Sequence, residues 1–419
     1  MKEYRKGLMT QYPCSRGRAF VCKNIGDYVQ SIASKQFVDE VDDYIEQEEA
    51  NFYKTKDGRK CRLIMNGWFQ WRAENWPPSD DIIPLLVSMH ISPLREKQLL
   101  TDAGINFLKK NAPVGCRDLY TMELLKANGI DAYFSACVTL TLGKKYYIDE
   151  NKRNGIYFVD PYFEIPNLYE NQNEKLILNE SIFNEFIGFY SKNSEIINKL
   201  AEKQFFKEYS PTGFLDRDLN TYRSFYKAYC FYKVYSKKFS DEILLNAEYI
   251  THWIDVDMQC QTNFDLLNIA ESLIKKYASA ELVITSRIHA GLPCLGLNTP
   301  VVFIANEEVT SESGNFNTPG RLGGLLELFR ILKLENGNFC SDDEIFSKIS
   351  VFDKDSIFKN KDLWKKYADL LSNQLRSFMA SDFKLSELCK IRNLPLNKVG
   401  GGYNSIVKLY SPSCNLKVA

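Results

Sequence analysis

Arg287 and His289 stand two positions apart, directly after a short run that predicts a buried strand. Residues 282–285 of that run are apolar or β-branched, and the small apolar residues 290–297 predict a buried helix before a second strand at 300–305. A guanidinium binds carboxylates and phosphates through paired hydrogen bonds, and an imidazole can give or take a proton near neutral pH. These residue types at this spacing therefore indicate an anionic substrate and a proton transfer.

The Arg287–His289 corner lies where a predicted strand gives way to a helix. Ligands bind at this carboxyl edge in open α/β sheets, and helix amino termini attract anions. Taken alone, an arginine or a histidine at a strand end is more often part of a salt bridge or a core hydrogen bond. Further polar clusters stand at other predicted strand ends or turns, and their number favours a functional cleft: Asn24 with Asp27, Asn66 with Gly67, His90, and Arg117 with Asp118.

The length and charge of the chain narrow the classes of protein to which it can belong. With 419 residues it is expected to form two or three domains, because single cores seldom exceed about 250–300 residues. Lys and Arg together number 53, as do Asp and Glu, so no global basic field favours nucleic acid or a membrane surface. The amino terminus lacks an apolar signal segment, and no run approaches the ~20 apolar residues of a membrane span. We therefore expect a cytoplasmic protein.

Cysteine and histidine usage gives no sign of a metal centre. The 11 cysteines are scattered without CxxC or CxxH pairs, and they predict neither zinc ligands nor a disulfide framework. The three histidines, His90, His252 and His289, are far apart in the sequence. We expect reduced thiols and no bound metal, and few candidates remain for a general base.

Alternating strands and helices must position the polar residues. Strands are predicted at 61–71, 82–92, 114–117, 131–142 and 155–163. Helices are predicted at 27–41, 101–110, 264–277 and 362–379, with one more that Asn128-Gly129 ends. This alternation is typical of a mainly parallel sheet.

Polar residues near the predicted helix starts are candidate caps. Asp27 is the expected cap of the first helix, and Thr262 with Asp265 resembles a capping box. Asp118 either caps the helix that follows Arg117 or belongs to the cleft, and the pattern favours neither.

Residues 164–245 interrupt the alternation with an aromatic, Lys-rich and helical pattern. We interpret its aromatic stripe as helix packing rather than a sugar platform: Tyr222, Phe225, Tyr226, Tyr229 and Tyr232. The predicted organisation is α/β, with lobes at 1–163 and 246–355, a helical insertion or linker at 164–245, and a helix and tail at 356–419. Two such lobes are expected to face each other across a cleft.

The chain resembles the polysaccharide pyruvyl transferase family in three segments. They are the Asn24-Ile25-Gly26-Asp27 run, GCRDLYTMELLKANGIDAYFSACVTLTL at 115–142, and SRIHAGLPCLGLNTPVVFI at 286–304. The Asn66-Gly67-Trp68-Phe69 run is also typical of this group. The second and third segments are the more specific, and the insertion and the tail add nothing to the resemblance.

The resemblance implies two Rossmann-like lobes in a GT-B-like fold. It also implies transfer of a pyruvyl group from phosphoenolpyruvate to two sugar hydroxyls, as a cyclic ketal. The donor is expected to lie against Ser286, Arg287 and Ile288, with His289 as the acid or base, and Arg117 matches a second donor arginine. Two guanidiniums suit the phosphate and carboxylate of phosphoenolpyruvate. The remaining cleft or acceptor candidates are Asn24, Gly26, Asp27, Asn66, Gly67 and His90.

The implied partners are phosphoenolpyruvate, as a co-substrate, and a sugar bound for a surface polysaccharide. Neither a cofactor nor a metal is expected. The acceptor is expected to be linked to a lipid or a nucleotide, and a lipid-linked acceptor would require peripheral contact with the inner membrane face. The sequence holds no basic amphipathic helix that predicts this contact.

Three other functions remain open from the sequence. A GT-B glycosyltransferase with a nucleotide-sugar donor would use Glu307-Glu308 to bind a ribose. A cysteine hydrolase would pair Cys137 or Cys294 with His289, although inert core thiols are the better interpretation at these apolar positions. A non-catalytic glycan-binding homologue is disfavoured because Arg117, Arg287 and His289 occur together.

Overall fold

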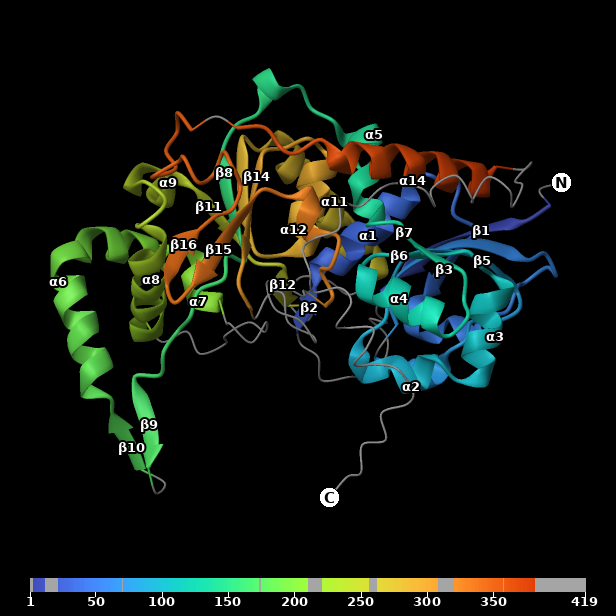
Figure 1. The fold of residues 1–419 in the computed structure, drawn as a ribbon, viewed down its shortest axis with the longest axis horizontal. Coiled ribbons are helices and arrows are strands. Elements are labelled where there is room, and N and C mark those ends of the chain that lie inside the picture. Colours follow the sequence, from blue (N-terminus) through green and yellow to red (C-terminus); the bar gives the residue numbers. More distant parts are fainter. Residues whose placement is uncertain are drawn as a thin grey trace.

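Two six-stranded sheets lie side by side in the computed structural model of the protein (Figure 1). The structure describes residues 3–11, 22–69, 71–172, 175–209, 221–255, 262–307, 320–356 and 358–380. Glu308 and the chain after residue 380 lie outside the described residues, so the predictions made for them are not addressed. The domain limits given above stay predictions.

The first sheet is parallel throughout, with the strand order β3-β1-β4-β5-β6-β7. Its strands are β1 (Arg5–Thr10), β3 (Asp43–Glu46), β4 (Cys61–Trp68), β5 (Ile82–His90), β6 (Val114–Cys116) and β7 (Ala132–Phe134). The chain leaves β1 for β3 on one side and then returns to β4 on the other. The order therefore reverses between β1 and β4, and ligands bind at the carboxyl edge of such a reversal.

The second sheet has the order β11-β8-β13-β14-β15-β16, and only β16 runs antiparallel to its neighbour. Its strands are β8 (Ile156–Val159), β11 (Glu248–Ile250), β13 (Leu282–Thr285), β14 (Val301–Ala305), β15 (Ile331–Glu335) and β16 (Asn338–Cys340). Here the order reverses between β8 and β13. The expectation of α/β halves with mainly parallel sheets is confirmed.

The helices cover both sheets and fill the space between them. In the first half they are α1 (Ile25–Lys35), α2 (Glu96–Leu99), α3 (Asp102–Lys110), α4 (Leu119–Ala127) and α5 (Gly143–Tyr146), with the 3₁₀ helices η1 (Gln47–Phe52), η2 (Ala73–Asn75), η3 (Pro93–Arg95), η4 (Val138–Thr141) and η5 (Glu150–Lys152). In the second half they are α11 (Asn263–Ser279), α12 (Ile288–Gly296), η6 (Leu326–Leu328) and α14 (Leu363–Met379).

Four sequence predictions for these elements are wrong in detail. The helix predicted at 27–41 ends at Lys35. The cap of α1 is Asn24, whose Oδ1 accepts from the backbone N–H of Gly26, and Asp27 lies inside the first turn. The strand predicted at 131–142 ends at Phe134, because Ala136 turns the chain with a φ of 56°. The strand predicted at 155–163 ends at Val159, because Asp160 takes a φ of 39°.

The insertion is helical, as predicted, and it packs on the second sheet (Figure 1). It contains α6 (Glu180–Glu202), α7 (Gln204–Glu208), α8 (Thr221–Tyr235) and α9 (Asp241–Asn246), with an unpredicted hairpin of β9 (Tyr169–Gln172) and β10 (Lys175–Leu178). Tyr226, Tyr229 and Tyr232 of the aromatic stripe are buried in its core, so they pack as expected. The side chain of Tyr222 lies outside the described residues.

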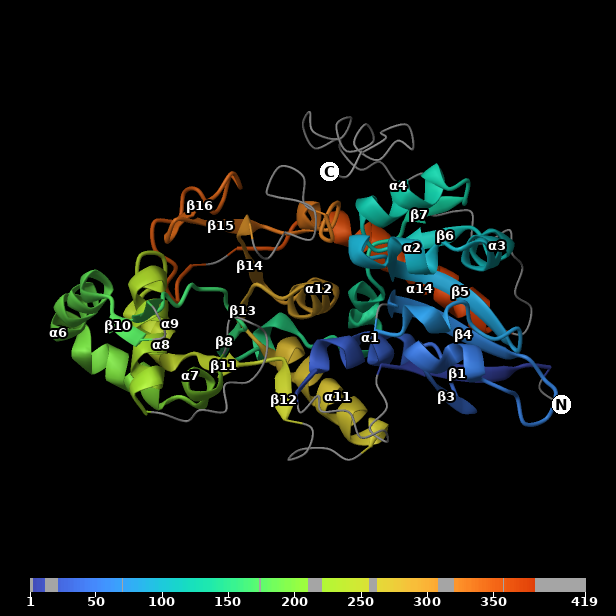
Figure 2. The same cartoon turned by 90° about the horizontal axis from the view of Figure 1, so that it is seen from below.

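One hydrophobic core joins the two halves of the molecule. It runs without a break from α1 through α11 and α12 to α14, which returns along the first half (Figure 2). There Gln374 of α14 donates from Nε2 to the Tyr133 hydroxyl at 2.6 Å, and the ring of Tyr367 packs on Phe134. A short antiparallel pair of β2 (Cys22–Asn24) and β12 (Trp253–Asp255) adds a second link.

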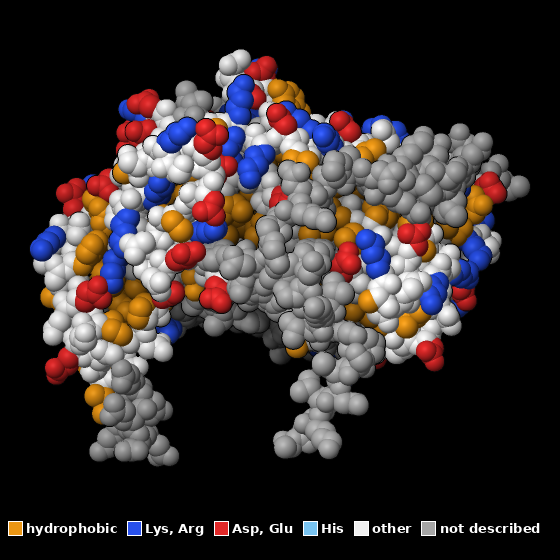
Figure 3. All heavy atoms as spheres, viewed as in Figure 1, with side chains coloured by type: hydrophobic (Ala, Val, Ile, Leu, Met, Phe, Trp, Pro, Cys, Tyr) orange, Lys and Arg blue, Asp and Glu red, His pale blue; other side chains and the backbone are white. Residues whose placement is uncertain are grey.

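Charged side chains of both signs are mixed over the face shown in Figure 3. In the described chain, no helix is long and apolar enough to cross a membrane.

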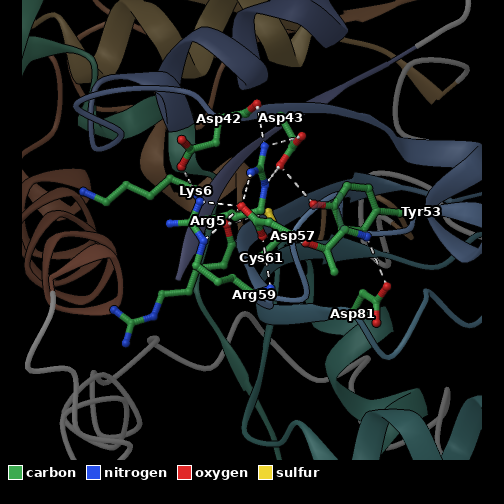
Figure 4. Close-up of polar contacts among 11 residues, drawn as sticks. Arg5, Lys6, Asp42, Asp43, Tyr53, Asp57, Arg59, Cys61 and Asp81 are labelled. Atoms are coloured by element: carbon green, nitrogen blue, oxygen red, sulfur yellow. Dashed lines mark hydrogen bonds and ion pairs between the residues drawn. The ribbon is translucent and has the colours of Figure 1, made fainter. Parts of the chain in front are cut away.

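A network of ion pairs ties the amino ends of three strands in the first sheet (Figure 4). Arg5 at the start of β1 donates to the carboxylates of Asp43 in β3 and of Asp57 ahead of β4. The hydroxyl of Tyr53 donates to Asp43 at 3.0 Å. Although burial raises the pKa of Asp43, hydrogen bonds from Arg5 and Tyr53 hold this pKa below its ordinary value. This network lies at the edge opposite the carboxyl ends and stabilises the sheet that carries the site.

Candidate active site

A pocket opens at the carboxyl edge of the first sheet, near the reversal of strand order. It is lined by Gln11, Asp27, Gln30, Gln47, Trp68, Trp71, Arg117 and His289. Gln47, Gln11 and Trp68 stand at the ends of the neighbouring strands β3, β1 and β4, and Arg117 follows β6. Helix α1 supplies Asp27 and Gln30, while His289 comes from α12 in the other half. Both halves thus build one pocket at the position where α/β sheets bind ligands.

His289 faces the carboxylate of Asp27 in this pocket. Its Nδ1 lies 3.5 Å from Oδ1 of Asp27, across the contact between α12 and α1. Burial lowers the pKa of His289 below its ordinary value, and the hydrogen bond and charge of Asp27 oppose this shift in part. The imidazole is therefore neutral near pH 7. Its Nε2 is buried and has no hydrogen-bond partner within the described residues, so it is available to a ligand.

Arg117 brings a buried cation to the same pocket, with only 3% of its surface exposed. Its Nε lies 3.9 Å from Oδ2 of Asp118, and that oxygen lies 2.7 Å from Nδ1 of His90. The other oxygen of Asp118 accepts from the backbone N–H of Thr121 at 2.9 Å and caps α4. Asp118 therefore does cap its helix, and it also links His90 to Arg117. Two residues hold the carboxylate of Asp118 in place, and this carboxylate puts a negative charge beside the guanidinium.

His90 itself does not line the pocket. It is buried behind the pocket residue Trp68, with the two ring centroids 5.5 Å apart, and it is linked to Arg117 through Asp118.

Arg287 lies beside the pocket rather than among its lining residues. Its Nε donates to Oδ2 of Asp160 at 3.1 Å, and the same oxygen accepts from the backbone N–H of His252 at 2.9 Å. The guanidinium stands 5.7 Å from the ring centroid of Trp253, and 31% of the side chain is exposed. Asp160 thus anchors Arg287 at the strand reversal of the second sheet.

Ser286 and Ile288 make structural contacts outside the pocket. Ser286 accepts at Oγ from the backbone N–H of Tyr162 at 3.0 Å, and Ile288 is buried in the core that joins the halves. Neither lines the pocket.

Asn24 and Gly26 let α1 approach the second half closely. A Cβ on Gly26 would lie 2.8 Å from Nδ1 of His252 and 3.0 Å from Cβ of His289, so no larger residue fits. The backbone N–H of Ile25 donates to the carbonyl of His252 at 2.8 Å. These two residues position Asp27 against His289.

Asn66 and Gly67 shape the other end of the pocket without lining it. Oδ1 of Asn66 accepts from the Ser34 hydroxyl at 2.9 Å. Gly67 has a φ of 140°, at an irregularity in β4, and a Cβ there would stand 2.6 Å from Oε1 of Gln47. Gly67 therefore makes room for the Gln47 carboxamide.

A family model described as polysaccharide pyruvyl transferase matches residues 24–308, which is more than half of the chain. The chain belongs to this family. The match includes Asp27, Arg117 and His289, and it confirms the resemblance drawn from the sequence. Polysaccharide pyruvyl transferase activity is the general function that the family indicates. No curated protein and no solved structure matches the chain.

Several residues of this pocket were missed from the sequence. Gln11, Gln30, Gln47 and Trp71 line it, as does Trp68, which was quoted only as part of a motif. Glutamines carry no spacing pattern of their own, and the available signal was their place at strand ends. Asp160 was hidden because the strand before it was predicted four residues too long.

The pocket does not support a cysteine hydrolase. Cys137 and Cys294 are fully buried, and burial raises the pKa of both thiols. Neither lines the pocket, so neither provides a thiolate beside His289. Within the described ranges, no group of three or more His, Cys, Asp or Glu residues is placed to hold a metal ion.

Proposed function

We propose that the protein transfers a pyruvyl group from phosphoenolpyruvate to two hydroxyls of a sugar in a surface-polysaccharide precursor, forming a cyclic ketal. Membership of the family supports the reaction class. The observation that carries the proposal is the convergence of a buried arginine, Arg117, and a buried neutral histidine, His289, from opposite halves into one pocket.

The donor binds at the Arg117 end of the pocket in this proposal. Phosphoenolpyruvate carries a phosphate and a carboxylate, and a guanidinium pairs with either through two hydrogen bonds. The amino end of α12, where His289 stands, adds a favourable field for an anion. Arg287 is the proposed second arginine for the donor, held ready by Asp160 next to the corner.

His289 acts as the general base in this mechanism. With Nδ1 toward Asp27, its Nε2 takes the proton of the first sugar hydroxyl as that oxygen attacks C2 of the donor. In the same step C3 takes one proton from water, which makes C2 electrophilic and C3 a methyl group, and His289 later returns its proton to water. Phosphate then leaves C2, the second hydroxyl closes the ring there, and its proton goes to the phosphate. The two protons lost by the sugar thus balance those gained by C3 and the phosphate, and phosphoenolpyruvate is the only co-substrate required.

The proposal also includes the arrangement of the two lobes and the carrier of the acceptor sugar. Two mainly parallel sheets that meet at a shared pocket support a GT-B-like arrangement of Rossmann-like lobes. The acceptor sugar is carried on a lipid or a nucleotide, and a lipid carrier places the protein in peripheral contact with the inner membrane face.

The first test is ligand-induced thermal stabilisation, with phosphoenolpyruvate compared with a panel of nucleotide-sugars. A ligand at a hundredfold excess over its Kd stabilises the native state by about 2.7 kcal/mol. Phosphoenolpyruvate is expected to raise Tm, and Arg117→Ala and Arg287→Ala are expected to abolish the shift. Arg95→Ala, at an arginine outside the pocket whose side chain donates to Gln98 at 3.1 Å, is the control that keeps the shift.

Other outcomes would change the assignment. Stabilisation by a nucleotide-sugar alone would make the protein a glycosyltransferase. Binding of phosphoenolpyruvate without phosphate release in the presence of any acceptor glycan would make it a non-catalytic homologue.

A further inference from the structure

The pocket contains hydrogen-bonding groups that the protein itself does not use. Five of its eight lining residues hold a buried polar atom with no hydrogen-bond partner in the described part of the chain. These atoms are Oε1 of Gln30, Oε1 of Gln47, Nε1 of Trp68, Nε of Arg117 and Nε2 of His289. Buried polar atoms in native proteins are nearly always paired with protein or water. Their concentration here indicates a pocket shaped for a polar ligand.

The lining residues divide the pocket into two chemically different ends. Gln47, Gln11 and Trp68 stand over the adjacent strands β3, β1 and β4, and Gln30 approaches from α1. We call these four residues, with Trp71, the amide end. Arg117 stands over β6, two strands beyond β4, and carries the positive charge of the other end.

We propose that the amide end is the acceptor subsite and that it selects an uncharged sugar ring. This inference rests on the proposed function, which assigns the Arg117 end to the donor. A sugar hydroxyl both donates and accepts, so it can donate to Oε1 of Gln30 or Gln47 and accept from Nε1 of Trp68. Trp71 is 49% exposed at the same end and offers an aromatic face on which the C–H face of a sugar can stack.

The fold fixes the carboxamide of Gln47 in the orientation that this recognition needs. Its Nε2 donates to the carbonyl of Trp68 at 2.7 Å, which leaves Oε1 as the acceptor. The missing side chain of Gly67 gives that oxygen its space, because a Cβ would come within 2.6 Å of it.

The charges around the amide end disfavour an anionic sugar. None of its five residues is cationic. The buried carboxylate of Glu48, the residue after Gln47, accepts from the backbone N–H groups of Trp71 at 3.3 Å and Arg72 at 2.8 Å. A sugar carboxylate would lose its water close to this negative charge and would find no counter-ion there.

The test measures binding of methyl glycosides to the full chain by ligand-observed NMR titration, with and without phosphoenolpyruvate. The panel contains the methyl glycosides of glucose, galactose and mannose. Each is compared with the methyl glycoside of the matching uronic acid (the uronide), in which a carboxylate replaces the hydroxymethyl group. For at least one pair, the neutral glycoside is expected to have a Kd at least about tenfold lower than that of its uronide.

Two glutamine variants locate the binding to the amide end. Gln30→Met keeps the length of the side chain but removes the acceptor, and it should weaken the neutral glycoside about tenfold, in line with loss of a hydrogen bond. It should leave the thermal shift with phosphoenolpyruvate unchanged. Gln36→Met is the matched control from the end of the same helix, because Gln36 contacts Ala33 and Thr141 outside the pocket.

The subsite and the proposed function can fail separately. A uronide that binds as tightly as its neutral partner, or no glycoside binding while phosphoenolpyruvate binds, would overturn the subsite and leave the donor intact. Loss of sugar and donor together in Gln30→Met would also overturn it. Neutral glycosides that bind a protein with no response to phosphoenolpyruvate would support the subsite and refute the donor assignment.

Discussion

Burial of His289 and its contact with Asp27 have opposite effects on the protonation state on which the proposed chemistry depends. Burial lowers the pKa of His289, and the carboxylate 3.5 Å from its Nδ1 opposes that shift. A neutral imidazole with Nδ1–H directed at Asp27 presents Nε2 as a base. Asp27 therefore orients the ring and tunes its pKa at the same time, whereas the sequence predicted Asp27 both as a helix cap and as a cleft candidate.

Asp27→Asn should separate these two roles. Without the carboxylate, protonated His289 loses a stabilising charge, so its pKa falls further and the acidic limb of kcat/KM moves to lower pH. Turnover at the optimum should fall on the order of tenfold to a hundredfold, because the ring is less well oriented. The pH–rate profile checks both effects. A limb that moves to higher pH would show that Asp27 does not act on His289.

We expect the buried side chain of His252 to make the protein less stable in mild acid. Burial lowers its pKa to about 4, from 6.5 for the free side chain. Between these values the unfolded chain binds the proton and the folded chain does not. Protonation therefore favours the unfolded chain, and the free energy of unfolding, which is unaffected above pH 6.5, falls as pH decreases toward 4. By pH 5 the free energy of unfolding should drop by about 2 kcal/mol from this group.

Urea unfolding at pH 7 and pH 5 measures this effect against His252→Gln. The variant loses the contact between Nε2 of His252 and the Tyr277 hydroxyl at 2.7 Å, so it should be less stable at pH 7. Its stability should depend less on pH than that of the parent, by about the same 2 kcal/mol. An equal pH dependence in both proteins would show that His252 is not the group responsible.

At the scale of the element, helix α1 and its entry turn decide whether the pocket forms. The cap Asn24, the close approach at Gly26 and the side chains Asp27 and Gln30 all belong to this one segment. The position of its amino end is fixed by the backbone hydrogen bond from Ile25 to His252 in the other half. A small displacement of α1 therefore alters both ends of the pocket.

Gly26→Ala tests this dependence directly. The added Cβ would come within 2.8 Å of His252 and 3.0 Å of His289, so α1 must shift away from α12. We expect the free energy of unfolding to fall by about 1–3 kcal/mol, as for overpacked cores, and activity to fall more than stability predicts. Activity and urea unfolding on the same preparation check this expectation.

The matched control is Gly188→Ala in α6, where a Cβ would meet nothing within 4 Å. Alanine favours a helix by about 1 kcal/mol over glycine, so this variant should be slightly more stable and fully active. Unchanged activity in Gly26→Ala would show that α1 does not set the geometry of the pocket.

The sequence predicts elements better than it predicts their ends. The apolar periods locate β4, β5, β13, α3 and α11 closely, because these signals come from many residues. The ends of β7 and β8 depend on single residues, Ala136 and Asp160, that adopt positive φ without being glycine. No local pattern announces such residues, because the surrounding tertiary structure imposes their conformation.

The same contrast applies to the candidate site. Arg117 and His289 can be found because motifs carry them, and the structure brings them to one pocket. Arg287, Ser286 and Ile288 share the motif, yet the pocket does not include them, since spacing along the chain does not say which way a side chain points. The glutamines of the amide end meet only through strand order, which a single sequence does not reveal.

At the scale of the whole molecule, the two halves behave as one folded body. The same core includes residues of α1, α11, α12 and α14, so each half would lose part of its packing without the other, although each also has a core of its own. The sequence predicted α14 from its apolar face but could not say that this face packs back on the first half. Periodicity identifies a buried face and leaves its partner open.

Differential scanning calorimetry should therefore give a single unfolding transition for the full chain, despite its size. Separate domains would unfold in separate steps, whereas a shared core couples them. Trp364→Ala, a large-to-small change in the α14 part of this core, should reduce the free energy of unfolding by about 3–5 kcal/mol. It should lower the Tm of that one transition without splitting it. Two resolved peaks in either protein would contradict the coupling.

The half-exposed ring of Trp71 gives the pocket an optical reporter of its own. Of the five tryptophans in the chain, Trp68 and Trp71 line the pocket, and the other three, Trp76, Trp253 and Trp364, do not. A sugar stacked on Trp71 would remove water from a ring that is now 49% exposed and would shift its emission to shorter wavelength. Occupancy of the acceptor end can thus be followed by intrinsic fluorescence in real time, without a label and before any product forms.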